Sequence, residues 1–397
     1  MVGSSVPRVP RILSLRELNR ATLARQLLLR RARLDPVEAI DRLAGLQAQW
    51  SPSPYLALWT RLSHFQRDDL TEALLERRVV KATLMRTTLH LVSAREYSHY
   101  AKVTSDARVR LLTTVARRTG LDTAHLNDEL MRFASRKPRS LTEIGDFVLG
   151  RIGPSKHPTS TVGRFALWTL LSADGWFVNA PPNGLWGSYV GGQYVAARSW
   201  LRPLRAPTVE AAAMHVLRRY LAAFGPATLA DAVSWSHGRP AVLRAALEGL
   251  GDEVVSFTDE RGRTHHDLRR APRPGPEAPA PVRFLPKWDS LLLAYQPPER
   301  VRVLPERLRR AVIAVNGDVT PTVLVDGIVA ARWDARQTKG AAVVSVAPFG
   351  RLARSDRAAI IEEGERLARF IHPEAGSHGV RIVRPDGLPR WNQSIKL

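Results

Sequence analysis

The chain has 397 residues, of which 59 are Lys or Arg and 37 are Asp or Glu, so its formal net charge is +22. This length exceeds what one hydrophobic core usually organises, and a hydrophobic share of 44% is enough to give each of about two to four domains a core. The absence of cysteine excludes disulfides, thiolate zinc sites, iron–sulfur clusters and a cysteine nucleophile.

The basic surplus is almost entirely arginine, because only seven of the basic residues are Lys. Codon bias exchanges Lys for Arg but does not create a net charge of this size. Clustered Arg neutralises phosphates and forms forked hydrogen bonds with them, so the composition indicates a nucleic acid as the polyanionic partner. Acidic lipid is the alternative, but no long basic amphipathic helix with an aromatic face supports it. Because residues 1–11 lack an apolar run and no apolar window of about 18 residues occurs, we expect a cytoplasmic, nucleoid-associated protein without a membrane span.

The first expected unit covers residues 10–105. Apolar periodicity predicts four helices followed by two strand-like runs that meet at Met85-Arg86; the helices lie at roughly 15–30, 36–46, 53–63 and 68–77, and the strands at 79–84 and 87–92. Helices followed by a β-hairpin are typical of a winged helix, which this unit matches only loosely.

A second unit of the same order is expected at residues 106–205. Three helices, at 125–136, 141–150 and 159–173, precede a predicted hairpin whose tip is Pro181-Pro182-Asn183-Gly184. Ser140 stands three residues before Glu143, which is the spacing of a helix capping box.

The third unit, residues 206–270, has the clearest pattern. A helix from Thr208 ends at Phe224-Gly225-Pro226, and a helix–turn–helix follows, with helices at 228–235 and 240–250. Strands at 254–257 and 264–268 complete a winged helix. Its exposed arginines, Arg239 in the turn and Arg261 and Arg263 at the hairpin tip, are expected to contact DNA.

A proline-rich, extended linker at residues 271–281 separates these repeats from a β-rich domain at 282–397. Strands at 311–315, 322–325, 328–333 and 341–346 are predicted to form an antiparallel meander, which a helix at about 355–370 follows. The expected fold class is therefore α+β, with tandem winged-helix repeats and a β-rich C-terminal domain.

The most unusual local sequence is Gln47-Ala48-Gln49, at an expected helix end beside Trp50 and a break rich in Ser and Pro. One interpretation is structural, because a Gln side chain can cap a helix end or bond a neighbouring backbone amide. Spacing alone does not identify a site.

Four segments resemble the bacterial AlkZ-like winged-helix DNA glycosylases: residues 45–49, 78–92, 224–228 and 284–293. The resemblance spans nearly the whole chain. It implies winged helices that form a positively charged channel, a Gln-apolar-Gln catalytic motif, and removal of bulky N7-alkylated purines, including interstrand crosslinks. Gln47 and Gln49 fall on the two Gln positions of that motif. A related branch has Asp at the second position, so Gln49 favours the crosslink-glycosylase side.

Neutral amides suit this chemistry. An N7-alkylguanine is already a cation, so the base can leave without a general acid, and the enzyme mainly holds a water and stabilises charge on the sugar. A Gln carbonyl can accept from the water, and its amide NH₂ can bond the lesion or a phosphate. We expect a monomeric, monofunctional glycosylase that acts on double-stranded DNA without cofactor or metal. The alternative is a non-catalytic winged-helix regulator or resistance protein that binds DNA.

Other residues have weaker patterns. Arg86 and His90, near the first hairpin, suit phosphate contact, although a satisfied half-buried His is an equal alternative. Trp50 and Asp289 are candidates for supporting the site, with a turn-capping role favoured for Asp289. Lys287 suits a surface position better than that of a Schiff-base nucleophile.

The run His265-His266-Asp267 resembles a metal-binding cluster. Adjacent residues on a strand point to opposite faces, so shared ligation is not expected. Residues 150–156 do not end in the Gly-Lys-Ser/Thr of a phosphate-binding loop, so no nucleotide cofactor is expected either.

Overall fold

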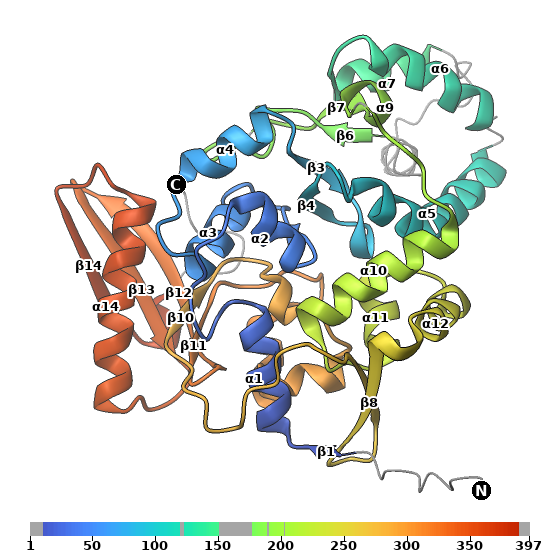
Figure 1. The fold of residues 1–397 in the computed structure, drawn as a ribbon. Coiled ribbons are helices and arrows are strands. Elements are labelled where there is room, and N and C mark those ends of the chain that lie inside the picture. Colours follow the sequence, from blue (N-terminus) through green and yellow to red (C-terminus); the bar gives the residue numbers. More distant parts are fainter. Residues whose placement is uncertain (1–10, 120–122, 151–176, 189, 202, 389–397) are drawn as a thin grey trace, which may run out of the picture.

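The computed structural model describes residues 11–119, 123–150, 177–188, 190–201 and 203–388. Helices combine with sheets of three, five and six strands in a mixed α+β fold. Figure 1 shows the C-terminal sheet and α14 on one side of the N-terminal helices, and α10, α11 and α12 on the other. Within the described ranges, no helix combines the length and the apolar composition needed to span a membrane.

The four N-terminal helices begin close to their predicted starts and end earlier than predicted. They are α1 (Leu15–Arg25), α2 (Pro36–Arg42), α3 (Pro52–Arg61) and α4 (Arg67–Leu75). The helix predicted at 36–46 is wrong at its end, because Ala44 and Gly45 take left-handed φ values of 57° and 87°. The chain then enters β2 (Leu46–Gln47). Gln47 therefore lies in a strand and not at a helix end.

The hairpins of the first two expected units share one six-stranded sheet, in the order β2-β4-β3-β6-β7-β5. Its strands are β3 (Val79–Thr83), β4 (Leu89–Ser93), β5 (Arg139–Ser140), β6 (Phe177–Asn179) and β7 (Gln193–Ala196), besides β2, and η1 (Met85–Thr87) joins β3 to β4. The pairing of Lys81 with Asn179 connects the two hairpins.

Helices α5 (Tyr97–Thr119), α6 (Thr123–Ser135), α7 (Leu141–Leu149) and α9 (Ala197–Trp200) accompany this sheet. The boundary expected between residues 105 and 106 lies inside α5. The capping box of Ser140 and Glu143 is present at the start of α7. The helix expected at 159–173 lies outside the described residues.

The third unit has the predicted order of three helices and a hairpin. These elements are α10 (Val209–Phe224), α11 (Leu229–Ser236), α12 (Pro240–Gly249), η4 (Gly251–Glu253), β8 (Val254–Asp259) and β9 (Thr264–Leu268). A short strand that the sequence did not predict, β1 (Ile12–Leu13), pairs in parallel with β8 and so ties the N-terminus to this unit.

The C-terminal sheet has the order β10-β11-β12-β13-β14 and is covered by α14 (Arg354–Ile371). Its strands are β10 (Arg283–Leu285), β11 (Thr322–Val325), β12 (Ile328–Thr338), β13 (Ala341–Pro348) and β14 (Ser377–Ile382). Short helical elements lie between β10 and β11, and one follows β14: η5 (Ser290–Leu292), η6 (Pro297–Arg302), η7 (Glu306–Leu308) and α13 (Arg309–Val312), and then η8 (Pro385–Gly387).

One predicted strand of this domain is wrong, and the pairing of the other three is confirmed. The strand expected at 311–315 is instead the end of α13 and a turn, because Ile313 N donates back to Arg309 O at 2.7 Å and only an isolated bridge to Val319 remains. The antiparallel meander predicted for 322–325, 328–333 and 341–346 is confirmed in β11, β12 and β13, and the sheet has a further strand that was not predicted. After α14 the chain returns to the far edge, where β14 runs parallel to β13.

Two hydrophobic cores meet at the six-stranded sheet. Alternate residues of β3 and β4 point to opposite faces, so Val79 and Leu91 join a core with the C-terminal sheet, while Val80 and Val92 join a core with α5 and α10. The sheet that carries β2 at its edge thus packs against the C-terminal sheet on one face and against α5 and α10 on the other.

Candidate active site at the edge of the six-stranded sheet

Gly45 makes the approach to the site possible. Its φ is +87°, and a Cβ at this position would lie 3.1 Å from Val92 Cγ1 and 3.2 Å from Leu91 O. Without a side chain, the backbone comes close enough to β4 for Gln47 to pair with His90. The Gln-Ala-Gln motif is therefore held on an edge strand by backbone hydrogen bonds.

Gln47 is buried, with 5% of its surface exposed, and its carbonyl Oε1 accepts a hydrogen bond of 2.7 Å from Arg86 Nη2. The same guanidinium lies 3.3 Å from His90 Nε2 and donates from Nη1 to Trp235 O at 3.4 Å. The structure thus brings together three residues that the sequence analysis singled out separately: Gln47, Arg86 and His90.

The protonation state of His90 follows from its partners. Its Nδ1 faces Thr88 O at 3.0 Å, an acceptor, so Nδ1 carries the proton and Nε2 accepts from Arg86. Burial and the charge of Arg86 lower the pKa of His90 to about 3. Burial and nearby Arg300 lower the pKa of Arg86 to about 10, so at neutral pH the guanidinium is charged and the imidazole is neutral.

The backbone that presents Arg86 is strained. Arg86 and Thr87 both have left-handed φ values, 53° and 57°, which are rare for residues with a Cβ and especially for a β-branched one. Hydrogen bonds within the turn hold this shape, with Thr87 N donating to Leu84 O and Thr88 N to Met85 O, each at 3.0 Å. Strain of this kind clusters at functional sites.

Gln49 lies at the surface just beyond β2, where its Oε1 accepts a hydrogen bond of 2.9 Å from Leu89 N. Gln49 thus bonds a backbone amide, as the structural interpretation expected. The amide belongs to strand β4 and not to a helix end. Trp50 is half-buried and packs against the core shared with the C-terminal sheet.

Additional basic groups surround Arg86. His237 is left-handed, with a φ of 58°, at the end of α11; partial burial of its ring and the charge of Arg86 lower its pKa. Arg300 is half-buried and donates to Tyr295 O at 2.9 Å. Local sequence patterns do not single out these two residues, because only the packing of α11 and η6 brings them near the first hairpin.

The predicted DNA contacts of the third unit differ in their availability. Arg239 and Arg261 are exposed; Arg239 pairs with Asp106 at the surface. Arg263 pairs instead with Asp259, at 2.6 Å, and with Glu299. His90, likewise, is buried with both ring nitrogens engaged. Arg263 and His90 are thus both engaged in contacts within the protein, unlike exposed Arg261.

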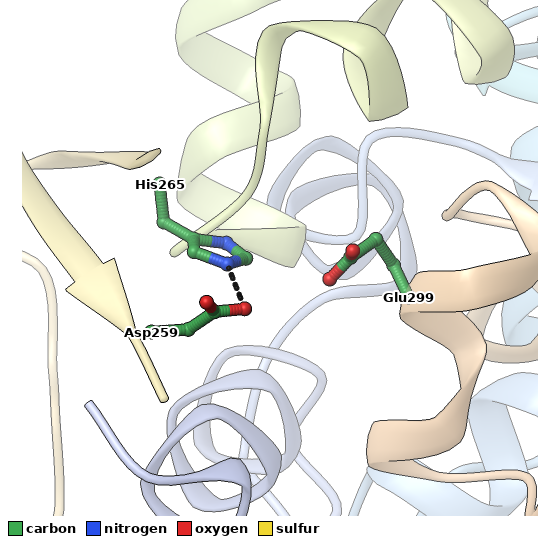
Figure 2. A group of neighbouring side chains, drawn as sticks. All are labelled: Asp259, His265 and Glu299. Carbon is green, nitrogen blue, oxygen red and sulfur yellow. Dashed lines mark hydrogen bonds and ion pairs between the residues drawn. The ribbon is translucent and has the colours of Figure 1, made fainter. Parts of the chain in front are cut away.

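Figure 2 shows Asp259 and His265 facing each other, with Glu299 on the opposite side. Their ligand atoms lie within 4.8 Å of one another, which is a spacing compatible with a metal ion. The guanidinium of Arg263 already bonds both carboxylates. Burial opposes ionisation of Asp259, but hydrogen bonds from Arg263 and His265 outweigh it and lower the pKa of that carboxyl. The cluster is therefore a charge-compensated network that fixes the hairpin.

Asp289 and Lys287 have structural partners. Asp289 is buried, binds Arg61 through two hydrogen bonds of 2.9 and 2.8 Å, and accepts from Leu291 N at 3.0 Å. Lys287 Nζ lies 3.1 Å from Asp318 Oδ1 and over the ring of Trp288. Through Arg61, Asp289 anchors α3, the helix that follows the Gln motif in the chain. Among the described residues, Asp289 has no hydrogen bond with Gln47.

Comparisons with known proteins bear on the fold and the family of this chain. A solved structure, Streptomyces sahachiroi DNA glycosylase AlkZ, shares the fold with a TM-score of 0.75 and 23% identity, covering 94% of this chain and all of that one. A relative from the same organism, an interstrand DNA cross-link repair glycosylase, is 25% identical over 358 residues, which are 87% of this chain and 94% of that protein. The family model for DNA glycosylase AlkZ-like proteins matches residues 40–370, so the chain belongs to the AlkZ-like DNA glycosylase family.

Proposed function

We propose that this protein is a DNA glycosylase that hydrolyses the N-glycosidic bond of bulky or crosslinked N7-alkylated purines in duplex DNA. One observation carries the proposal: both glutamine amides of the motif are fixed at a sheet edge, Gln47 by the charged guanidinium of Arg86 and Gln49 by the backbone amide of Leu89. Family membership and the relative's name, which specifies crosslink repair, support the choice of reaction.

We further propose that the three helix-and-hairpin units act as winged helices that hold the duplex. The order of α10, α11, α12 and the β8–β9 hairpin matches that motif, and the net charge of +22 suits a phosphate backbone. Exposed Arg239 and Arg261 are the proposed phosphate contacts in this part.

The site residues divide the chemistry between them. Gln49 is exposed, and its carbonyl has a second lone pair after accepting from Leu89 N, so it can hold the attacking water. The N7-alkylated base leaves as a neutral molecule, so no general acid is needed at this sheet edge. Undamaged purines lack this activated leaving group and should not be cleaved.

The test is base release from a duplex that carries one N7-methylguanine. Incubation with purified protein should yield free N7-methylguanine and an abasic site, while undamaged duplex stays intact. DNA binding without base release would support the non-catalytic alternative, a winged-helix regulator or resistance protein.

The same assay separates monofunctional from lyase chemistry. A Schiff-base lyase needs an available amine, and Lys287 is held by Asp318 at 3.1 Å. We expect an uncleaved abasic strand and no covalent adduct after borohydride treatment. A trapped adduct that is absent in a Lys287→Met variant would contradict the monofunctional assignment.

A further inference from the structure

We propose that Arg86 is a positioning residue for Gln47: it binds the amide oxygen and thereby turns the amide NH₂ group toward the DNA, where it donates to an acceptor atom of the damaged strand. The proposal rests on the proposed function. It changes the role expected for Arg86 from phosphate contact to orientation of a catalytic amide.

The orientation of the Gln47 amide follows from the chemistry of its neighbour. A guanidinium has only donors, so the amide atom 2.7 Å from Arg86 Nη2 must be the oxygen. The NH₂ group then lies on the other side, and no described residue accepts a hydrogen bond from it. Gln47 Nε2 is not one of the buried side-chain atoms that lack a partner, so the NH₂ group keeps contact with solvent and an acceptor on the substrate can reach it.

Arg86 is itself held firmly enough to fix this orientation. Its guanidinium bonds Trp235 O and neutral His90 besides Gln47, and its backbone is in the left-handed conformation. Because burial keeps His90 unprotonated, Nε2 remains an acceptor over the whole neutral pH range. His90 thus helps to hold Arg86 in place, and Arg86 holds the amide oxygen of Gln47.

The hydrogen bond also determines which end of Gln47 is available for chemistry. An amide oxygen that already accepts a short, charge-assisted hydrogen bond is a poorer acceptor for a water. The NH₂ group becomes the useful end, and its targets are acceptors near the glycosidic bond: a phosphate oxygen or an acceptor on the lesion base, such as O6 of guanine.

The first experiment compares Gln47→Ala with Gln47→Glu in single-turnover base release from N7-methylguanine duplex. The carboxylate keeps the bond to Arg86 but lacks the NH₂ donors. If the donor end acts on the DNA, both variants lose about 10²-fold or more in rate. Wild-type-like base release by Gln47→Glu would overturn the donor role, whereas wild-type-like release by Gln47→Ala would instead overturn Gln47 as part of the proposed site.

The second experiment tests Arg86 by separating the rate from binding. Arg86→Met should lower the maximal single-turnover rate by about 10-fold or more while the Kd for the duplex and its salt dependence stay near wild type. In the Gln47→Ala background the same substitution should cost nothing further, because both changes remove one function. A weaker, less salt-dependent Kd with an unchanged rate would show that Arg86 contacts phosphate and would overturn the proposal.

Stability controls accompany these variants. Arg302→Met is matched, because Arg302 is also a buried arginine that donates to a backbone carbonyl, Pro226 O at 2.8 Å. It should lower the Tm and leave the rate of the folded fraction unchanged. If Arg86→Met does not fold, His90→Phe and His90→Gln replace it: the phenylalanine removes the acceptor for Arg86 and should slow base release, and the glutamine restores the acceptor and should recover most of the rate.

The acceptor on the DNA is identified with methylphosphonate linkages placed one at a time beside the lesion. If a phosphate oxygen accepts from Gln47, one linkage should slow the wild type by the same factor as Gln47→Ala and should not slow that variant further. If every linkage affects the two proteins equally, the acceptor lies on the lesion base.

Discussion

At the scale of single residues, the two glutamines of the motif differ in burial and therefore in what their replacement should cost. Gln49 is exposed and bonded to a backbone amide, so Gln49→Ala should cost about 1 kcal/mol of stability or less. If Gln49 holds the attacking water, the same change should lower single-turnover base release by about 10²-fold while the Kd for DNA stays near wild type.

Gln49→Asp is the informative partner of that variant. A carboxylate can accept from the water but adds a charge, so we expect activity on a simple N7-methyl lesion to persist and activity on a bulky crosslink to fall. Equal base release by Gln49→Ala and wild type would remove Gln49 from the site.

A second prediction at this scale concerns Lys81, which is buried on β3 and packs its Cδ against Gly184. Burial lowers its pKa from 10.5 to about 8, and none of the described carboxylates pairs with it. Between these two pH values the unfolded chain binds more protons than the folded one, so stability rises with pH over this interval. Below pH 8 the burial costs up to about 3 kcal/mol.

Lys81→Met should therefore raise the free energy of unfolding at pH 7, and this advantage should shrink toward zero as the pH rises from 8 to 10.5. Chemical denaturation of both proteins across this range measures the difference. A difference that does not vary with pH would mean that Lys81 is not charged at pH 7 or is solvated in the folded protein.

The sequence singled out every residue of the Gln47–Arg86–His90 contact but not the contact itself. The apolar period continues through Leu46 and predicts Gln47 at a helix end. The left-handed Ala44 and Gly45 end the helix earlier, and the chain continues as a strand. Its contact with Arg86, 39 residues away, depends on strand register and on a strained turn, which local periodicity does not contain.

At the scale of the elements, the β8–β9 hairpin separates two arginines that look equivalent in the sequence. Arg261→Ala should weaken binding to all duplexes alike and reduce the slope of log K against log salt by about one, because one exposed phosphate contact is lost. Arg263→Ala should leave that slope unchanged and lower stability by about 1–3 kcal/mol, because buried Asp259 and Glu299 lose their shared cation. Salt titrations and denaturation curves measure both, and a reduced salt slope in Arg263→Ala would contradict this division.

Helices and hairpins with strong turn signals were predictable, as in the third unit, where Thr228 and Asp231 form a capping box at the start of α11. Elements that exist only through pairing with distant chain were not. β1 has only two residues and exists through its pairing with β8. β14 pairs with β13, from which α14 separates it along the chain. The segment at 311–315 shows the converse, since its apolar residues suit a strand but have no partner strand to complete one.

At the scale of the whole molecule, the proline-rich linker and the parts of the chain that it joins are all bonded to one helix, α1. The proline-rich segment 271–281 has no helix or strand, yet its carbonyls at Pro276 and Ala278 accept hydrogen bonds of 2.7 Å from Arg16 and Arg20 of α1. The same helix binds the third unit, because Arg25 forms two hydrogen bonds of 2.6 and 2.8 Å with buried Asp267.

Helix α1 also reaches the C-terminal domain, where Asn19 Nδ2 donates to Gly327 O at 2.9 Å and to Arg302 O at 2.6 Å. With one helix bonded to three parts of the chain, we expect a single cooperative thermal transition, with calorimetric and van't Hoff enthalpies that agree. A protease site inserted at exposed Gly275 should be cut without release of the C-terminal fragment, because its contacts with α1 remain; gel filtration of the cut protein tests this. Two resolved transitions, or free C-terminal fragment after cleavage, would show that the linker joins independent domains. The sheet edge that carries Gln47 would then have to keep its geometry without the core that its sheet shares with the C-terminal domain.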